Sequence, residues 1–334
     1  MKYPYYLGNV QKRRETPAQL PISRRAQMLK PEHYKADQGL VDACNVAIIL
    51  GQPLLLTGEP GTGKTMFAYS LAWQLGFDAP LKFETKSTST AQDLFFIYDT
   101  LKQFQDAHGS VIDKGPLDYL TYQALGKAIL FTRDPNDVQH VLPPGFQHPG
   151  RQRSVVLIDE VDKAPRDFPN DILNELEYLY FRVPELQNQE IEADSELQPI
   201  VIITSNSEKD LPEAFLRRCI YYHIPFPEED RLKEIVTNRL GLYSAGSSDF
   251  LREALDLFFK LRKFSLGKKP AVAELLGWMI ALQEISDAEN PLSQPELALK
   301  TLSSLIKTTD IQTQKATEMV EEWVENRQKQ SQAG

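Results

Sequence analysis

An α/β domain built on a parallel β-sheet, followed by an all-helical C-terminal domain, is the fold class that the sequence of 334 residues predicts. Short continuous apolar runs, of which Val155–Ile158 is the clearest, are typical of strands that are buried on both faces. Helical patterns separate these runs, and strands that alternate with helices favour a parallel sheet covered by helices on both sides. From Pro227 onward only helical patterns follow. We therefore place the boundary between the two domains at residue 226.

The individual elements follow from these patterns in chain order. Residues 1–30 are rich in Arg, Lys, Gln and Pro and are predicted to form an N-terminal extension. The α/β domain, residues 31–226, is predicted to contain helices at 42–50, 64–75 and 167–180, strands at 54–57, 81–85, 155–159, 200–204 and 220–224, and a hairpin at 181–192. Residues 90–150 show no sustained period and indicate an insertion. The helical domain, residues 227–327, is predicted to contain helices at 229–240, 248–261, 271–285, 296–307 and 313–327, with a polar tail at 328–334.

Composition and charge exclude several classes of protein. The chain has 37 Lys and Arg residues against 46 Asp and Glu residues, and its formal net charge of −9 argues against a dedicated nucleic-acid-binding protein. No apolar run is long enough to span a bilayer, and the N-terminus has no apolar core of signal-peptide length, so we expect a cytoplasmic protein without a membrane partner. The two cysteines, Cys44 and Cys219, cannot form a disulfide framework and are expected to be reduced.

The strongest motif is a glycine-rich loop between the first predicted strand and the helix that follows it. Its eight residues fit the pattern G-x-x-x-x-G-K-[ST]: Gly58, Glu59, Pro60, Gly61, Thr62, Gly63, Lys64 and Thr65. Glycines allow successive backbone N–H groups to point at phosphate oxygens, and the helix N-terminus adds its positive end. Lys64 supplies a cation for the β- and γ-phosphates, and the hydroxyl of Thr65 is a ligand for Mg²⁺. The loop therefore predicts nucleotide binding.

A second motif places two acids at the end of a buried strand. Four apolar residues at 155–158 are followed by Asp159 and Glu160. Ligands of open α/β sheets bind at the carboxyl ends of the strands, which is where this run delivers the acids. Asp159 is the candidate Mg²⁺ ligand, and Glu160 is the candidate base that polarises the attacking water. Together with the phosphate loop, the pair indicates ATP hydrolysis.

These motifs give the chain a family resemblance. The segments GEPGTGKT, VVLIDEVDKAP, IITSN and LPEAFLRRC together resemble an AAA+ ATPase, and the finer pattern over residues 34–285 resembles the MoxR type, in the helix-2-insert branch. The resemblance implies the P-loop NTPase fold with strand order 5-1-4-3-2. It also implies a helical lid, an insertion near the second helix, and a hairpin before the fourth core strand.

The resemblance also assigns roles to residues outside the two motifs. Asn206 matches sensor 1, which orients the water near the γ-phosphate. Arg218, with Arg217 as the second choice, matches the arginine finger that reaches the ATP of a neighbouring subunit. The stretch that matches sensor 2 lacks the usual Arg, and Lys268 or Lys269 stands there instead. We take Lys269 as the candidate nucleotide contact, and a solvated lysine pair before a helix that starts with proline is the alternative.

The function implied is that of an ATP-driven remodelling factor. MoxR-type ATPases form hexameric rings, and many act with a partner that carries a von Willebrand A domain. A low-turnover, ATP-dependent assembly switch is the first alternative, because the sensor 2 Arg is missing. A nucleic-acid-associated AAA+ motor is the second, and the charge of −9 weighs against it.

Overall fold

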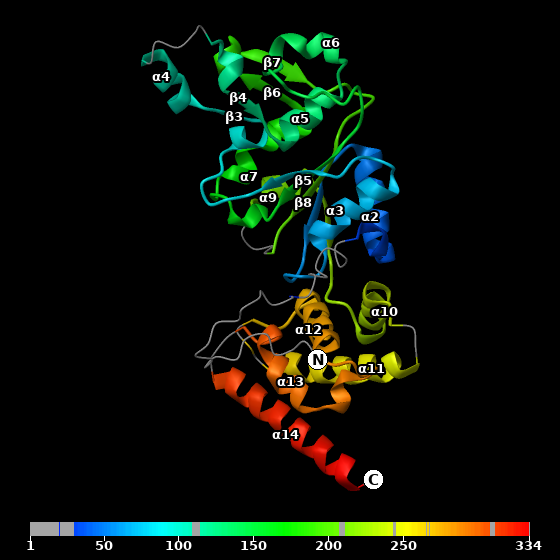
Figure 1. The fold of residues 1–334 in the computed structure, drawn as a ribbon. Coiled ribbons are helices and arrows are strands. Elements are labelled where there is room, and N and C mark those ends of the chain that lie inside the picture. Colours follow the sequence, from blue (N-terminus) through cyan, green and yellow to red (C-terminus); the bar gives the residue numbers. More distant parts are fainter. Residues whose placement is uncertain are drawn as a thin grey trace. The chain divides into compact units, whose positions relative to one another are not determined.

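The computed structural model describes residue 20 and residues 30–108, 114–206, 211–242, 245–264, 266, 268–307 and 311–333 (Figure 1). The chain divides into two compact units, one of Tyr34–Pro225 and the other of Phe226–Gly334 together with Met1–His33. The N-terminal extension predicted at residues 1–30 lies outside the described residues, apart from Leu20 and Lys30.

The first unit is built on a parallel five-stranded sheet. Its strands are β1 (Leu54–Thr57), β2 (Leu81–Glu84), β5 (Val155–Asp159), β8 (Ile200–Thr204) and β9 (Ile220–His223). They lie side by side in the order β2-β5-β8-β1-β9, and every neighbouring pair is parallel. Numbered one to five along the chain, the strands give the predicted order 5-1-4-3-2, which is confirmed. All residues of β1, β5 and β8 are buried, as their continuous apolar runs predict.

Alternate residues of the central strands belong to two different cores. Leu54 and Leu56 pack with residues of α2 (Gln38–Leu50) and α3 (Lys64–Gln74). Leu55 packs in the second core, with α5 (Ala124–Phe131), α7 (Phe168–Asp171) and α9 (Glu213–Leu216). Successive side chains of a strand point to opposite faces, so helices cover the sheet on both sides.

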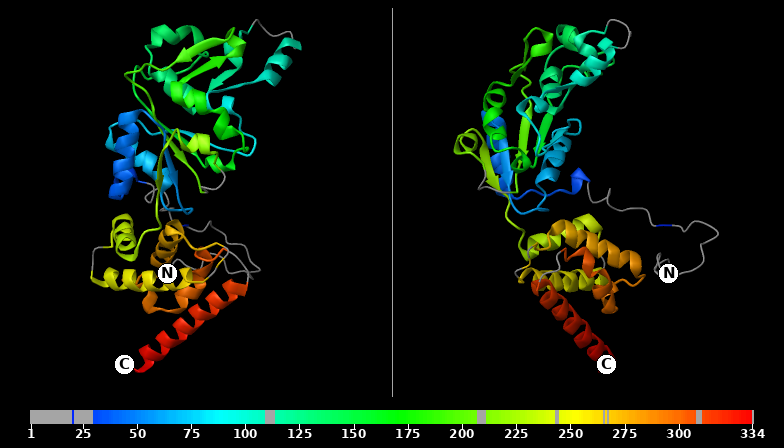
Figure 2. Two further views of the ribbon diagram at one scale, coloured as in Figure 1. Left: turned by 180° about the vertical axis from the view of Figure 1, so that it is seen from behind. Right: turned by 90° about the vertical axis from the view of Figure 1, so that its left-hand side faces the viewer.

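The region predicted as an insertion contains one helix of the sheet-covering layer. Seven of the eight residues of α5 are buried, and they share the core of β5. The part that extends from the sheet is smaller: β3 (Phe96–Tyr98) pairs antiparallel with β4 (Leu120–Tyr122), and α4 (Thr100–His108) lies at the far end of the unit (Figure 2). The short helix α6 (Pro135–Val138) follows α5.

The segment before β8 differs from the single helix predicted at 167–180. It forms two short helices, α7 and α8 (Leu173–Tyr178), and then the hairpin of β6 (Tyr180–Val183) and β7 (Gln189–Glu192). The predicted helix is too long because Leu179 adopts a left-handed conformation with φ of 51°. This turn is required because Tyr180 already pairs with Glu192 in the hairpin.

Helices are the only regular elements in the described part of the second unit. Its longer elements are α10 (Glu229–Leu240), α11 (Ala245–Arg262), α12 (Val272–Ile285), α13 (Glu296–Thr301) and α14 (Ile311–Ala333) (Figure 1). Trp278 is fully buried in its core, and its indole N–H donates a 2.8 Å hydrogen bond to Thr301 Oγ1. The polar tail predicted from residue 328 is instead helical as far as Ala333, because the segment lacks Gly and Pro. Within the described residues, none of the helices has the length and apolar character needed to cross a membrane.

Candidate nucleotide-binding site

The phosphate loop joins β1 to α3 in a conformation that requires glycine. Gly58, Gly61 and Gly63 have φ angles of 142°, 80° and 97°. A Cβ atom at Gly58 would lie 2.5 Å from the carbonyl oxygen of Ile224, so no larger residue fits there without a shift of the backbone. No side chain caps α3 at Gly63, which leaves the N–H groups of the first helical turn available to an anion.

The ammonium group of Lys64 lies over this loop. Lys64 is 6% exposed, and its Nζ donates to the carbonyl oxygens of Gly58 and Glu59 at 2.8 and 3.0 Å. Burial lowers the pKa of Lys64, and the negative charges of Asp162, Asp159 and Glu160 act against that decrease. The loop therefore holds a cation where the motif predicts the phosphates.

Two elements, α3 and β8, reach the carboxylate of Asp159 at the end of β5. Thr65 Oγ1, from the first turn of α3, donates to Asp159 Oδ1 at 2.9 Å. Thr204 Oγ1, from the end of β8, donates to the same oxygen at 2.7 Å. Asp159 is 7% exposed, and Thr204 is 1% exposed. Sequence reasoning missed Thr204, which ends the apolar run of β8 and carries the only hydroxyl group in that strand.

The hydroxyl of Thr65 and the carboxylate of Asp159 fit a magnesium ion that is bound together with a nucleotide. Both are oxygen ligands, and Mg²⁺ in such sites is held by one or two carboxylates, water and the phosphates of the substrate. Among the described residues, no cluster of three His, Cys, Asp or Glu side chains could hold a metal without other ligands. In a site of this kind, phosphate oxygens and water would complete the coordination.

Lys82 is a second residue that sequence reasoning missed. It lies on β2, and its Nζ is 3.0 Å from Asp159 Oδ2 and 2.7 Å from Glu84 Oε1. Burial alone would lower the pKa of Lys82, but the hydrogen bonds to Glu84 and Asp159 outweigh it, and the pKa is raised. The charged residues in the strand sequence LKFE alternate with apolar ones, and this pattern could have placed Lys82 and Glu84 on one face.

The structure also brings Glu160 and Asn206 together. Glu160 has a φ of 57°, in the left-handed region, and its backbone N–H donates to Thr204 Oγ1 at 2.9 Å. Its Oε1 accepts a 3.3 Å hydrogen bond from Asn206 Nδ2, and its Oε2 forms an ion pair with Lys163. The backbone N–H of Asn206 donates to Asp162 Oδ1 at 3.0 Å. The candidate base and the candidate sensor are thus in contact at one end of the sheet.

Comparison with known proteins gives the family of this chain. Residues 54–227, just over half of its length, match the model described as ATPase family associated with various cellular activities (AAA). The chain belongs to the AAA family of ATPases. It is therefore an ATPase, and AAA ATPases bind ATP, usually with Mg²⁺. A comparison with curated protein sequences gave no significant match.

Solved structures of one bacterial protein are similar to this AAA chain in fold. The RuvB Holliday junction branch migration motor of Thermotoga maritima has a TM-score of 0.41 at 15% identity, over 80% of this chain and 67% of that one. Two point variants of the same protein have TM-scores of 0.40 and 0.41 at 17% identity, over 79% of this chain and 66% or 67% of theirs. Similarity at this level concerns the fold alone.

The two candidates for the arginine finger lie at the end of the sheet where the strands begin, opposite the phosphate loop. Arg217 and Arg218 precede β9, and Ile220 at its start pairs with Leu54 at the start of β1, whereas the phosphate loop leaves the far end of β1. Arg218 Nε is 3.0 Å from Glu177 Oε2, and Arg217 forms an ion pair with Glu213. The structure therefore does not bring either arginine to the phosphate loop of its own chain.

Lys268 and Lys269 lie in the helical unit, just before α12, and both are exposed. A nucleotide contact by Lys269 stays a prediction.

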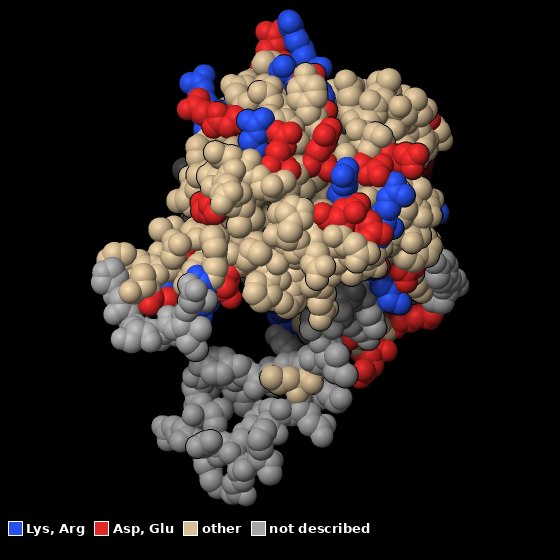
Figure 3. Space-filling model, turned by 90° about the horizontal axis from the view of Figure 1, so that it is seen from above, with Lys and Arg blue, Asp and Glu red and all other residues tan. Residues whose placement is uncertain are grey.

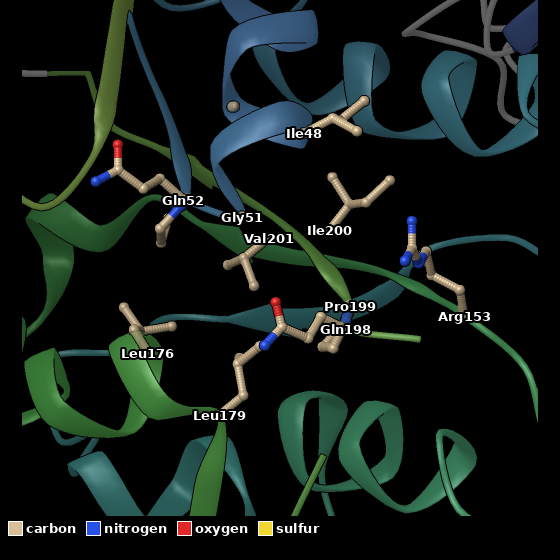
Figure 4. A pocket seen from close by; sticks show the side chains of 12 residues that line it. Ile48, Gly51, Gln52, Arg153, Leu176, Leu179, Gln198, Pro199, Ile200 and Val201 are labelled. Atoms are coloured by element: carbon tan, nitrogen blue, oxygen red, sulfur yellow. The ribbon is translucent and has the colours of Figure 1, made fainter. Parts of the chain in front are cut away.

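A pocket at the amino ends of the strands of the same sheet is too small for a nucleotide. It lies where β1 and β8 begin, and its lining includes Gly51, Gln198, Ile200 and the guanidinium of Arg153 (Figure 4). Its volume is about 50 Å³, which is the scale of a water molecule or two. The phosphate loop and the acids at the carboxyl edge remain the candidate site.

Proposed function

We propose that this AAA ATPase is a MoxR-like remodelling factor that uses ATP hydrolysis to assemble or activate a partner protein complex. The observation that carries the proposal is the meeting of Asp159, Glu160 and Asn206 beside the phosphate loop. The motif pattern over residues 34–285, with its hairpin before β8, supports the MoxR type within the family.

Each residue of the site then has a defined task. The backbone N–H groups of residues 58–65, except Pro60, which has none, and the ammonium of Lys64 bind the phosphates of ATP. Thr65 and Asp159 hold Mg²⁺, which neutralises charge on the phosphate oxygens when it is bound. Glu160 accepts a proton from the attacking water, and Asn206 fixes the carboxylate of Glu160 through its amide.

Hydrolysis in this proposal requires a second copy of the chain. Arg218 precedes β9 at the end of the sheet away from its own phosphate loop, where it pairs with the exposed Glu177, and we assign it to the ATP of a neighbouring subunit. AAA ATPases are generally oligomeric, and the MoxR resemblance favours a hexameric ring. Arg217 is the second candidate for this role, and Lys269 is the candidate lid contact.

The partner is proposed to be a protein with a von Willebrand A domain or another client protein. Nucleic acid is disfavoured by the net charge of −9. The face of the α/β unit seen in Figure 3 agrees with this, because acidic and basic residues are interspersed there. Ion pairs between such residues in this unit include Lys114–Asp106 and Arg182–Glu190.

The substitution Glu160→Gln tests the proposal. We expect ATP hydrolysis to fall by roughly a hundredfold or more, with nucleotide affinity retained, because the amide cannot accept the proton of the attacking water. Steady-state hydrolysis and the binding of a fluorescent ATP analogue measure the two effects. Glu192→Gln, at an exposed position of strand β7, is the control and should hydrolyse ATP as the wild type does.

A low-turnover assembly switch is the second candidate, favoured by the pair Lys268-Lys269 in place of the sensor 2 Arg. In that case the wild type and Glu160→Gln would show equal rates near zero. The ATP-loaded Glu160→Gln protein also serves as a trap for the client, and the recovery of a protein with a von Willebrand A domain would support the MoxR assignment.

A further inference from the structure

We propose that Lys82 sets the divalent-ion dependence of nucleotide binding, because it places a positive charge against the carboxylate of Asp159. The inference rests on the proposed role of Asp159 as a ligand of Mg²⁺. Lys82 is outside the phosphate loop and outside the acidic motif, and it comes from the neighbouring strand β2.

The two oxygens of Asp159 have different partners. Oδ1 accepts hydrogen bonds from the hydroxyls of Thr65 and Thr204, at 2.9 and 2.7 Å. Oδ2 faces Nζ of Lys82 at 3.0 Å. The carboxylate is therefore held on one side by two neutral donors and on the other by a cation.

The position of Lys82 in the sheet explains how it reaches Asp159. β2 is the edge strand next to β5, and Lys82 pairs with Leu157 while Glu84 pairs with Asp159. Residues that are paired or two apart share a face of the sheet, so Lys82 and Asp159 lie on the same side. The side chain of Lys82 is 27% exposed and that of Asp159 is 10% exposed, so water screens their interaction only in part.

Two effects of Lys82 on a bound divalent cation oppose each other. Its ion pair with Asp159 orients the carboxylate, which favours the cation. Its charge repels the cation, which disfavours it. The orientation of Asp159 is also secured by two hydroxyl groups, so it persists without Lys82. No other described residue replaces the repulsion. We therefore expect the net effect of Lys82 to be a weaker binding of the divalent cation.

Glu84 modulates this charge. Its Oε1 lies 2.7 Å from Nζ of Lys82, so its negative charge partly offsets the positive charge that Lys82 presents to Asp159. Loss of Glu84 leaves Lys82 paired with Asp159 alone. The substitutions Lys82→Met and Glu84→Gln should therefore shift the requirement for Mg²⁺ in opposite directions, which a merely structural role for β2 would not produce.

The experiment measures nucleotide affinity rather than hydrolysis. A fluorescent ADP analogue is titrated into the full chain at a series of free Mg²⁺ concentrations, for the wild type and for Lys82→Met, Lys82→Arg, Glu84→Gln and Asp159→Asn. We expect Lys82→Met to lower the half-saturating Mg²⁺ concentration roughly three- to tenfold, and added salt to reduce that shift. Lys82→Arg keeps the charge, so its half-saturating Mg²⁺ concentration should equal that of the wild type. Glu84→Gln should raise this concentration.

Other outcomes separate the inference from the proposed function. If Lys82→Met leaves the half-saturating Mg²⁺ concentration unchanged or raises it, while Asp159→Asn removes the Mg²⁺ effect, the inference is wrong and the role of Asp159 stands. If Mg²⁺ has no effect on nucleotide affinity in the wild type, the proposed ion site and the inference both fail. Thermal unfolding with ADP, with and without Mg²⁺, verifies that each variant is folded and gives a second measure of the same shift.

Discussion

The hydroxyl of Thr204 donates a 2.7 Å hydrogen bond to Oδ1 of Asp159. The same hydroxyl accepts a hydrogen bond of 2.9 Å from the backbone N–H of Glu160. A single side chain on β8 thus fixes both acids at the end of β5, one through its carboxylate and the other through its backbone. This contact holds Glu160 in the left-handed conformation that turns its carboxylate towards Asn206.

The substitution Thr204→Val should therefore affect both stability and hydrolysis. Valine keeps the shape but leaves the backbone N–H of Glu160 without its partner, and we expect a loss of about 1–3 kcal/mol in the free energy of unfolding. Hydrolysis should fall about tenfold or more, because Glu160 is no longer held in place. Denaturant titration and steady-state kinetics measure the two changes.

Thr132→Val is the matched control. Thr132 is fully buried in the same unit, donates to the carbonyl of Ile129 at 2.7 Å and accepts from the backbone N–H of Asp194 at 2.8 Å. It should destabilise the protein to a similar extent without a specific effect on hydrolysis. An equal loss of hydrolysis in both variants would contradict the positioning role of Thr204.

Gly58→Ala should impair nucleotide binding more than it impairs folding. Gly58 has a φ of 142°, and an added Cβ would meet the carbonyl oxygen of Ile224 at 2.5 Å. The loop must shift, and we expect nucleotide affinity to fall about tenfold or more. Gly145→Ala is the control: its φ is also positive, at 77°, but no atom lies within 4 Å of the added Cβ. That variant should lose only about 1 kcal/mol of stability, with unchanged affinity.

Arg218→Ala should abolish hydrolysis in assembled protein while nucleotide binding is retained. The ion pair with Glu177 joins side chains that are 43% and 45% exposed, so its loss should change the free energy of unfolding by less than about 1 kcal/mol. Hydrolysis is measured at concentrations where light scattering shows an assembly. Arg182→Ala removes a similar exposed pair in the hairpin and should hydrolyse ATP normally. Wild-type hydrolysis by assembled Arg218→Ala would refute the finger assignment.

The two cysteines should be unreactive in the folded protein. Burial raises the pKa of Cys44 from its ordinary value of 9.0 to about 11, and it raises the pKa of Cys219 to about 12. Both thiols are therefore neutral at pH 8, and iodoacetamide should modify them only after unfolding. Mass spectrometry of native and unfolded samples tests this, and fast modification of the native protein would contradict it.

These raised pKa values also predict a dependence of stability on pH. A thiol that ionises less readily in the folded state contributes its full stability below pH 9. Since the unfolded thiol ionises first, stability should fall as the pH rises from 9 to about 11, by up to about 1.4 kcal/mol per pH unit for Cys44. Denaturant titrations of the wild type and Cys44→Ala at pH 8 and pH 10 measure the contribution of Cys44.

The sequence by itself determined those features that depend only on residues close together in the chain. The phosphate loop needs glycines at fixed positions, and the acids of β5 follow directly from a run of apolar residues, so both are visible as local patterns. The helices α10 and α12 were predicted within a residue or two, because their apolar spacing is regular and glycine or proline lies at their ends. The AAA family follows from the same local motifs.

Tertiary structure alone decided the contacts that tune the site. Thr204 is 45 residues from Asp159 in the chain, and Lys82 meets Asp159 only because β2 pairs with β5 in the observed register. The left-handed turn at Leu179 likewise depends on the pairing of β6 with β7. Helix α5 lies in a region without a sustained sequence pattern, and its apolar residues are buried because they pack against the sheet. Local patterns report which side chains are buried or exposed. The family resemblance predicted the order of the strands. The register of β2 against β5 and the side-chain contact from β8, which bring a lysine and a threonine to the carboxylate of Asp159, came only from the tertiary structure.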